Sequence, residues 1–95
     1  MLGLDPHLHA PARLKLMSML IAVSEMEFST LREELEVSDS VLSKHIAALV
    51  DVDYVRSRKG SHLGRRTTWV STTRSGRSAL SAHVAALRAI IADVD

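Results

Sequence analysis

Five cationic side chains lie within fourteen residues in the second half of this sequence. The stretch from residue 56 to residue 69 reads RSRKGSHLGRRTTW, and it contains no acidic residue. Unpaired cations of this kind can neutralise phosphates, and on a nucleic acid this releases the counterions condensed along the backbone. We therefore expect phosphate contacts from Arg56, Arg58, Lys59, Arg65 and Arg66. Arg65 or Arg66 could instead reach into a minor groove, where a narrow groove concentrates negative potential.

Charge is strongly segregated along the chain, although the formal net charge is only +1. Residues 1–53 contain four Lys or Arg against nine Asp or Glu, a balance of −5. Residues 54–92 contain eight Lys or Arg and no acid, a balance of +8. Such segregation indicates that one face of the fold meets a polyanion. The alternative is a basic hairpin that is merely solvated.

Composition excludes several classes of protein. With 95 residues, 46% of them hydrophobic and 24% charged, the chain is predicted to form one small globular domain over residues 1–95. The absence of cysteine excludes disulfides and thiolate metal sites and fits a cytoplasmic protein. The longest apolar run, residues 16–23, is far shorter than the roughly 20 residues of a membrane span. Neither a glycine-rich phosphate loop nor a His–Asp–nucleophile arrangement is present, so we predict no enzyme, no cofactor and no metal.

Apolar periodicity predicts two helices in the first part of the chain. The first spans about residues 11–24 and is apolar around most of its circumference. The second lies in STLREELE, residues 29–36. There Thr30 and Glu33 have the spacing of a capping box, with Ser29 as the alternative cap.

A third helix, predicted over residues 38–50, has one polar face. Its buried face is predicted to comprise Leu42, Ile46, Leu49 and Val50. On the open face, Ser40, Ser43 and Lys44 can read base edges, and Asp39 can accept a hydrogen bond from cytosine N4. Free amides at the helix start, near its N-cap Ser38, can bind a phosphate. The predicted DNA contacts in this helix are Ser38, Asp39, Ser40, Ser43, Lys44 and His45, with an interhelical hydrogen bond as the alternative role of His45.

The periodicity then changes to that of strands. Residues 54–59 and 66–73 are rich in β-branched and aromatic types, which predicts an antiparallel hairpin with a loop around residues 60–64. Thr73 can cap a last helix over residues 74–94, whose apolar residues repeat with a mean period of 3.5. One helix packs along another with this spacing, so the apolar residues of this helix predict a dimer interface. The predicted interface comprises Leu80, Val84, Leu87, Ile91 and Val94.

The order of these elements and the motifs within them resemble a known family. The matching pieces are PARLKLMSML, FSTLREELEVSDSVLSKHIAALV, the YV that opens the hairpin, GRRTTW and the T-x-x-G-R of residues 73–77. Over residues 10–92 the chain resembles small winged helix-turn-helix transcriptional regulators of bacteria, close to the MarR and ArsR groups. The resemblance implies a mainly α fold with a small β-hairpin wing (α+β), in which residues 11–73 form the winged helix-turn-helix and residues 74–94 a dimerisation helix. It also implies a homodimer on double-stranded DNA, with the third helix in the major groove and the wing alongside.

Three residues depart from the pattern of that family. Glu36, in the helix-turn-helix bend, and Asp53, before the hairpin, stand where glycine is usual. A left-handed backbone at either position costs on the order of 1 kcal/mol relative to glycine. Thr72 replaces a usual leucine under the wing. These substitutions affect local turns rather than the fold.

Other residues leave alternatives open. His7, His9 and His83 could ligate a metal, whereas the interpretation we favour is a flexible N-terminal segment. Trp69 is expected to pack the wing against the body of the domain. The alternative function is a winged-helix module that binds an acidic protein or RNA. A small-molecule effector, if there is one, would lodge at the dimer interface.

Overall fold

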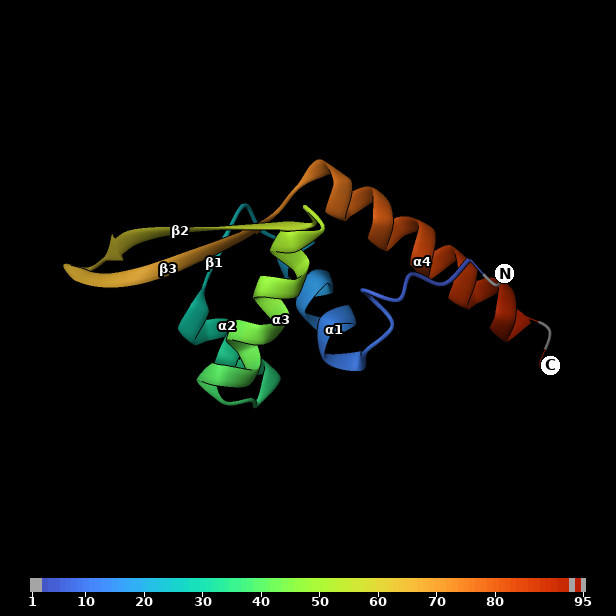
Figure 1. Cartoon of the computed structure of the whole chain (residues 1–95), viewed down its shortest axis with the longest axis horizontal. Helices are drawn as coiled ribbons and strands as arrows, with labels where there is room; N and C mark the ends of the chain where they lie inside the picture. Colours follow the sequence, from blue (N-terminus) through green and yellow to red (C-terminus); the bar gives the residue numbers. More distant parts are fainter. Residues whose placement is uncertain (1–2, 93, 95) are drawn as a thin grey trace.

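The structure, a computed structural model, describes residues 3–92 and 94 (Figure 1). Its helices are α1 (Pro11–Ile21), α2 (Phe28–Leu35), α3 (Asp39–Asp51) and α4 (Arg74–Ala92). The strands β1 (Met26–Glu27), β2 (Val55–His62) and β3 (Arg65–Thr72) form one antiparallel sheet in the order β1-β3-β2. The β2–β3 hairpin, called the wing below, extends to one side of the helical body and α4 to the other, so the chain measures 51 × 25 × 21 Å. The predicted α+β class, with a hairpin between the third and fourth helices, is confirmed.

One apolar core joins the short helices to the base of the wing. Burying one such aliphatic side chain stabilises a fold by about 1.5–3 kcal/mol, so this cluster decides how the elements pack. On α3, the core residues all lie on one side of the helix, which leaves its other side open to solvent. The buried apolar residues are Leu8, Leu16, Met17, Leu20, Leu31, Leu42, Ile46, Leu49, Val55, Val70 and Leu80.

The start of α2 differs from the sequence prediction. The helix begins at Phe28, so Thr30 lies inside it and the predicted capping box is wrong. The cause is a long-range contact: Met26 and Glu27 pair with β3, and the chain passes from this short strand directly into the helix. Glu27 then occupies the N-cap position without a side-chain cap. The first helix is also shorter than predicted, since it ends at Ile21.

Two tight turns keep a left-handed backbone without glycine. Glu36, which ends α2, has a φ of 54°, and Asp53, after α3, has a φ of 61°. Each therefore carries the cost, on the order of 1 kcal/mol, that a side chain has in this conformation. Between these turns, Ser38 Oγ accepts a hydrogen bond from the Val41 N–H at 3.2 Å, which confirms the predicted N-cap of α3.

The wing is longer, and its loop shorter, than the sequence predicted. β2 and β3 pair along their whole lengths. Only Leu63 and Gly64 lie between them, with φ angles of 51° and 81°. Two positive φ angles are those of a type I′ turn, whose twist matches that of the flanking strands. The predicted loop over residues 60–64 is therefore wrong, because Gly60 and His62 remain in the ladder.

Thr73 and Gly76 fix α4 to the base of the wing. Thr73 Oγ1 donates to the Asp53 carbonyl at 2.6 Å and accepts from the Gly76 N–H at 2.9 Å, which confirms the predicted cap. The Thr73 N–H donates to the Tyr54 carbonyl at 3.0 Å. Gly76 lies so close to this carbonyl that a Cβ at position 76 would be 2.1 Å from its oxygen. The direction of α4 is thus set by backbone atoms where the wing begins.

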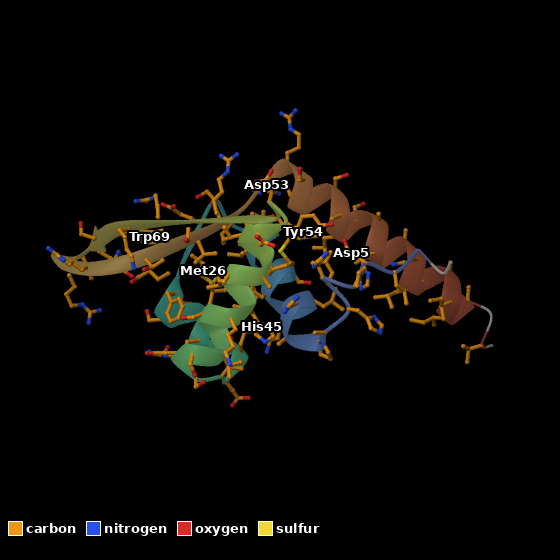
Figure 2. All side chains as sticks on the ribbon, viewed as in Figure 1. Asp5, Met26, His45, Asp53, Tyr54 and Trp69 are labelled. Carbon is orange, nitrogen blue, oxygen red and sulfur yellow. The ribbon has the colours of Figure 1, made fainter. Side chains whose placement is uncertain are left out.

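The N-terminal segment is folded rather than flexible. Asp5 accepts a hydrogen bond from the Tyr54 hydroxyl at 2.6 Å, which raises the pKa of Tyr54 to about 12 (Figure 2). The backbone N–H of Asp5 donates to Nδ1 of the buried His83 in α4 at 2.9 Å. Leu8 lies in the core. The prediction of a flexible segment is therefore wrong, because these contacts hold it against α4 and the base of the wing.

Candidate nucleic-acid interface

The open face of α3 carries short polar side chains and one ammonium group. Ser40, Ser43 and Lys44 are exposed on the side of the helix away from its buried leucines. The helix starts at the exposed Ser38, and the unpaired amides of a helix start favour an anion. This face therefore offers donors for both bases and phosphates.

Asp39 has a partner within the protein. Its Oδ1 accepts a hydrogen bond from Arg32 Nη1 at 2.8 Å, across the turn between α2 and α3. This hydrogen bond, and then the charge of Asp39, raise the pKa of Arg32 above its ordinary value. Asp39 would therefore approach a base as half of an exposed ion pair.

His45 lies against α1, where its Nδ1 accepts a hydrogen bond from Arg13 Nε at 3.1 Å (Figure 2). Burial, and then the charge of Arg13, hold the pKa of His45 below its ordinary value of 6.5. A neutral ring that accepts at Nδ1 carries its proton on Nε2, where it can donate to a phosphate. The interhelical hydrogen bond is confirmed, and a DNA contact from His45 stays a prediction.

Acid is expected to weaken the fold through His45. Because its pKa is lower in the folded protein, the unfolded chain binds a proton first as the pH falls below about 6.5. Neutral His45 therefore contributes its full stability above about pH 6.5. This stability is lost as the pH falls from about 6.5 to the lower pKa that His45 has in the folded protein. Urea unfolding of the wild type and of His45→Gln, at about pH 8 and about pH 5, measures this contribution. The wild type should lose more stability on acidification, and equal losses would contradict the assignment.

The predicted phosphate contacts divide between two faces of the wing. Side chains alternate along a strand, and directly paired residues share a face. The buried Val55 and Val70 define an inner face, and the register places Lys59 and Arg66 on it. The same register places Arg56, Arg58 and Arg65 on the outer face. The five cations of the wing are therefore divided between its two faces.

Arg58 is already occupied by a carboxylate. Its guanidinium makes two hydrogen bonds to Glu25, one of them from Nε to Oε2 at 3.0 Å, and lies 5.7 Å from the centre of the Trp69 ring. Trp69 itself is on the outer face of the wing, so the prediction that it packs against the body is wrong (Figure 2). Within residues 3–92 and 94, by contrast, neither Arg65 nor Arg66 forms an ion pair.

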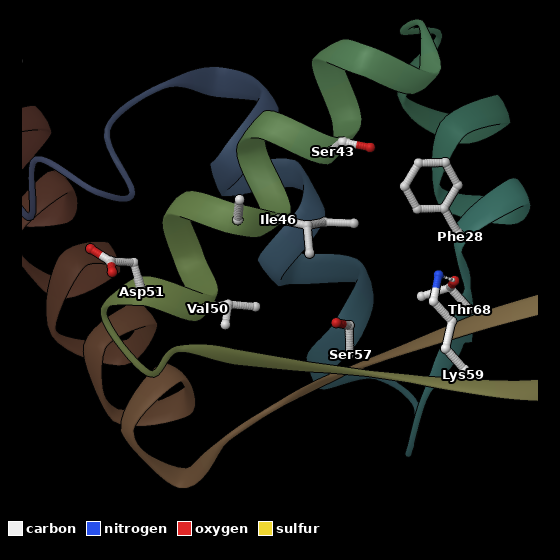
Figure 3. Close-up of a pocket in the computed structure, with 9 residues that line it drawn as sticks. Phe28, Ser43, Ile46, Val50, Asp51, Ser57, Lys59 and Thr68 are labelled. Carbon is white, nitrogen blue, oxygen red and sulfur yellow. Dashed lines mark hydrogen bonds between the residues drawn. The ribbon is translucent and has the colours of Figure 1, made fainter.

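A groove of about 420 Å³ separates α3 from the inner face of the wing (Figure 3). Ser43 and Val50 line it from α3, and Phe28 from the start of α2. From the wing, Lys59 Nζ donates to Thr68 Oγ1 at 3.2 Å. Val50 was predicted to be buried, but it is 43% exposed because it faces this groove. No local pattern marks Phe28 or Thr68 as part of the site, since only the tertiary fold brings them to the groove beside α3.

α4 leaves the body with part of its apolar surface uncovered. Leu80 is only 4% exposed and belongs to the core, so its assignment to a dimer interface is wrong. Val84 and Leu87 are half-buried, whereas Ile91 and Val94 are 64% and 78% exposed. The other four residues of the predicted interface are therefore not fully covered within one subunit and remain available to a second molecule.

The histidines considered as metal ligands make other contacts. The ring of His9 packs edge-on against that of His83, with centroids 6.0 Å apart, and His7 packs against Tyr54 at 6.3 Å. Among the residues that the structure describes, no three His, Cys, Asp or Glu side chains are placed to hold a metal ion. Nor does that part of the chain include a helix long and apolar enough to cross a membrane.

Fold and interface together define a class of protein: a winged helix DNA-binding domain. The sequence model of the family with that description matches residues 12–91, and the chain belongs to this family. It is a DNA-binding transcriptional regulator of the winged helix type, not a member of an enzyme family.

Individual proteins are similar to this chain in fold or in sequence. The fold is similar to that of a transcriptional regulator homologue from Pyrococcus horikoshii OT3, with a TM-score of 0.86 and 27% identity over 94% of this chain and 88% of the other. It is also similar to a MarR family transcriptional regulator from Silicibacter pomeroyi DSS, with a TM-score of 0.70 and 26% identity over 90% of this chain and 56% of that one. The uncharacterized protein MJ0432 of Methanocaldococcus jannaschii is 29% identical over 72 residues, which are 76% of this chain and 78% of MJ0432.

Proposed function

We propose that this regulator binds a specific sequence of double-stranded DNA as a homodimer, in the cytoplasm. In each subunit α3 enters the major groove and the wing lies along the adjacent backbone or in the minor groove. One observation carries the proposal: the open face of α3, with Ser40, Ser43 and Lys44, borders the groove whose other wall is the inner face of the wing. The major groove of B-DNA admits an α-helix such as α3. The DNA strand that borders the major groove can then lie in the protein's own groove, between α3 and the wing.

The side chains divide into two roles under this proposal. Ser40, Ser43 and Lys44 reach base edges, because they are exposed along the same face of α3. Lys59, on the inner face, and Arg66, near the exposed tip of the wing, neutralise phosphates. Contacts to phosphates position the protein, whereas contacts to bases supply the specificity.

The dimer forms through the uncovered side of α4. Ile91 is 64% exposed there, and Ile21, at the end of α1, is 40% exposed beside a groove that Val84 also lines. Covering this apolar surface with a second copy removes it from water. Twofold symmetry would then place the two copies of α3 about 34–36 Å apart, facing an inverted repeat.

Selection of genomic fragments with the purified protein, read by sequencing, tests the proposed function directly. An enriched inverted repeat is the expected result. If no fragment is enriched over bulk DNA at physiological salt, sequence-specific binding is wrong.

Arg66→Ala is expected to weaken binding by about the same factor on all DNA sequences. Loss of one phosphate contact should reduce the slope of log affinity against log salt by roughly 1. Arg74→Ala is the matched control, because it removes one exposed arginine outside the wing and the groove. Titrations of a labelled duplex at several salt concentrations give both slopes. If Arg66→Ala and the wild type give equal salt slopes, Arg66 does not contact the phosphate backbone of the DNA.

A further inference from the structure

Two carboxylates link the outer face of the wing to the segment that precedes α2. Glu25 accepts two hydrogen bonds from Arg58, as described above. Glu27 accepts a hydrogen bond from Thr67 Oγ1 at 2.9 Å, and its other oxygen lies 3.6 Å from His62 Nε2. The Glu27 side chain is only 16% exposed. Both acids therefore have specific partners on the wing, although they lie 33 to 40 residues earlier in the chain.

Trp69 fills the surface between these contacts. Its ring lies 5.7 Å from the Arg58 guanidinium and 5.6 Å, edge-on, from the His62 ring. It also lies across Gly60, where a Cβ would be 2.9 Å from Trp69 Cδ1. Arginine over an indole face and two aromatic rings edge to face are both attractive arrangements. The outer face is therefore a packed cluster, held at one side by the two glutamates.

The backbone alone restrains the wing only near its base. β1 pairs with β3 at Val70 and Trp69, whereas the ladder between β2 and β3 continues to the turn at residues 63–64. Beyond Trp69 no third strand supports the hairpin in the described residues. Thr67 and His62 lie in that outer part, so the carboxylate of Glu27 extends the restraint toward the tip.

We propose that Glu25 and Glu27 are positioning residues, which hold the wing at the angle from which it meets DNA. The proposal rests on the proposed function above. It also changes the role of Arg58, which serves as the wing's anchor to Glu25 instead of contacting a phosphate. Two negative charges beside a DNA-binding hairpin oppose DNA binding electrostatically, so their structural contribution must outweigh that effect.

Because the charge effect and the positioning effect of these acids oppose each other, the proposal can be tested by whether DNA affinity rises or falls when the acids are neutralised. Replacing Glu25 and Glu27 by glutamine raises the net charge by two, which by itself should strengthen binding to any DNA. If the acids position the wing, Glu25→Gln/Glu27→Gln should instead weaken binding to the selected operator. We expect a loss of about two- to fivefold, the size typical of an exposed ion pair. Glu34→Gln is the control, because it neutralises an exposed acid on α2 that makes no side-chain contact with the wing among the described residues.

Trp69 gives a second measurement that does not require DNA, because it is the only tryptophan in the chain. Its fluorescence anisotropy decay in the free protein reports motion of the wing. The double variant should show faster local motion of Trp69, and Glu34→Gln should not. Arg58→Gln should increase this motion at least as much as Glu25→Gln, because it also removes the guanidinium beside the Trp69 ring. Adding Glu25→Gln to Arg58→Gln should then change little, since the contact between the two residues is already lost.

The outcomes separate this proposal from the proposed function. Unchanged Trp69 motion in the double variant, or any rise in its affinity for the operator, overturns the positioning role. The salt dependence of DNA binding gives a further test. If Arg58→Gln reduces the salt slope and Glu25→Gln leaves it unchanged, Arg58 contacts a phosphate, and the positioning role is overturned. A wild type that binds no DNA would refute the proposed function, and the Trp69 decay would still decide whether the acids hold the wing.

Discussion

Gly76→Ala is expected to destabilise the protein by about 3 kcal/mol or more, at the upper end of overpacking substitutions. The added Cβ would lie 2.1 Å from the Tyr54 carbonyl oxygen and 2.7 Å from Thr72 Oγ1. The carbonyl is backbone at the start of the wing and already accepts from Thr73, so neither group can move without disturbing the other. Alanine is intrinsically better than glycine in a helix by about 1 kcal/mol, and the clash must exceed this gain.

Thermal unfolding measures the effect of this substitution. For a domain of this size, a loss of 3 kcal/mol corresponds to a fall in Tm of about 12 °C or more. Ser75→Ala, at the exposed neighbouring position of α4, adds no buried atom and should leave Tm nearly unchanged. An unchanged or higher Tm for Gly76→Ala would show that α4 can move away from Tyr54, and that its direction is not fixed there.

Features of this fold that depend on neighbouring residues were predictable from the sequence. Ser38 caps α3 because its hydroxyl meets an amide three residues later, and Thr73 caps α4 in the same way. The open side of α3 follows from helical periodicity alone. The hairpin was predicted from β-branched and aromatic residues, but its turn was placed too broadly because Leu63 gives no sign of a positive φ.

Errors arose where residues far apart in sequence meet. Thr30 does not cap α2 because β1 pairs with β3, about 43 residues later, and sets the helix start at Phe28. Arg58 is in the basic stretch, yet its partner Glu25 precedes it by 33 residues. The folding of residues 3–10 onto α4 depends on the same kind of contact, through Asp5, Tyr54 and His83. The distribution of charge along the sequence thus showed where cations are abundant, but it could not show which of them are paired with a carboxylate of the same protein.

The proposed dimer predicts the second large effect. Ile91→Asp should convert the dimer to a monomer, because a carboxylate buried in an apolar interface loses its hydration without gaining a partner. Ile91 is 64% exposed within one subunit, so the subunit itself should remain folded. Affinity for an inverted repeat should fall by about 100-fold or more, since the second half-site no longer binds as part of the same molecule. Sedimentation velocity and titration of the repeat measure the two effects.

Ala89→Asp controls for the charge alone. It introduces the same carboxylate at an exposed position two residues away, about 200° around the helix, and should leave the dimer intact. A duplex carrying one half-site separates dimer loss from damage to α3: Ile91→Asp and the wild type should bind it with similar affinity. Weaker half-site binding by Ile91→Asp would mean that the substitution disturbs the subunit. A dimer that survives Ile91→Asp would place the interface on a different surface, because the uncovered side of α4 could not then be the one that two copies share.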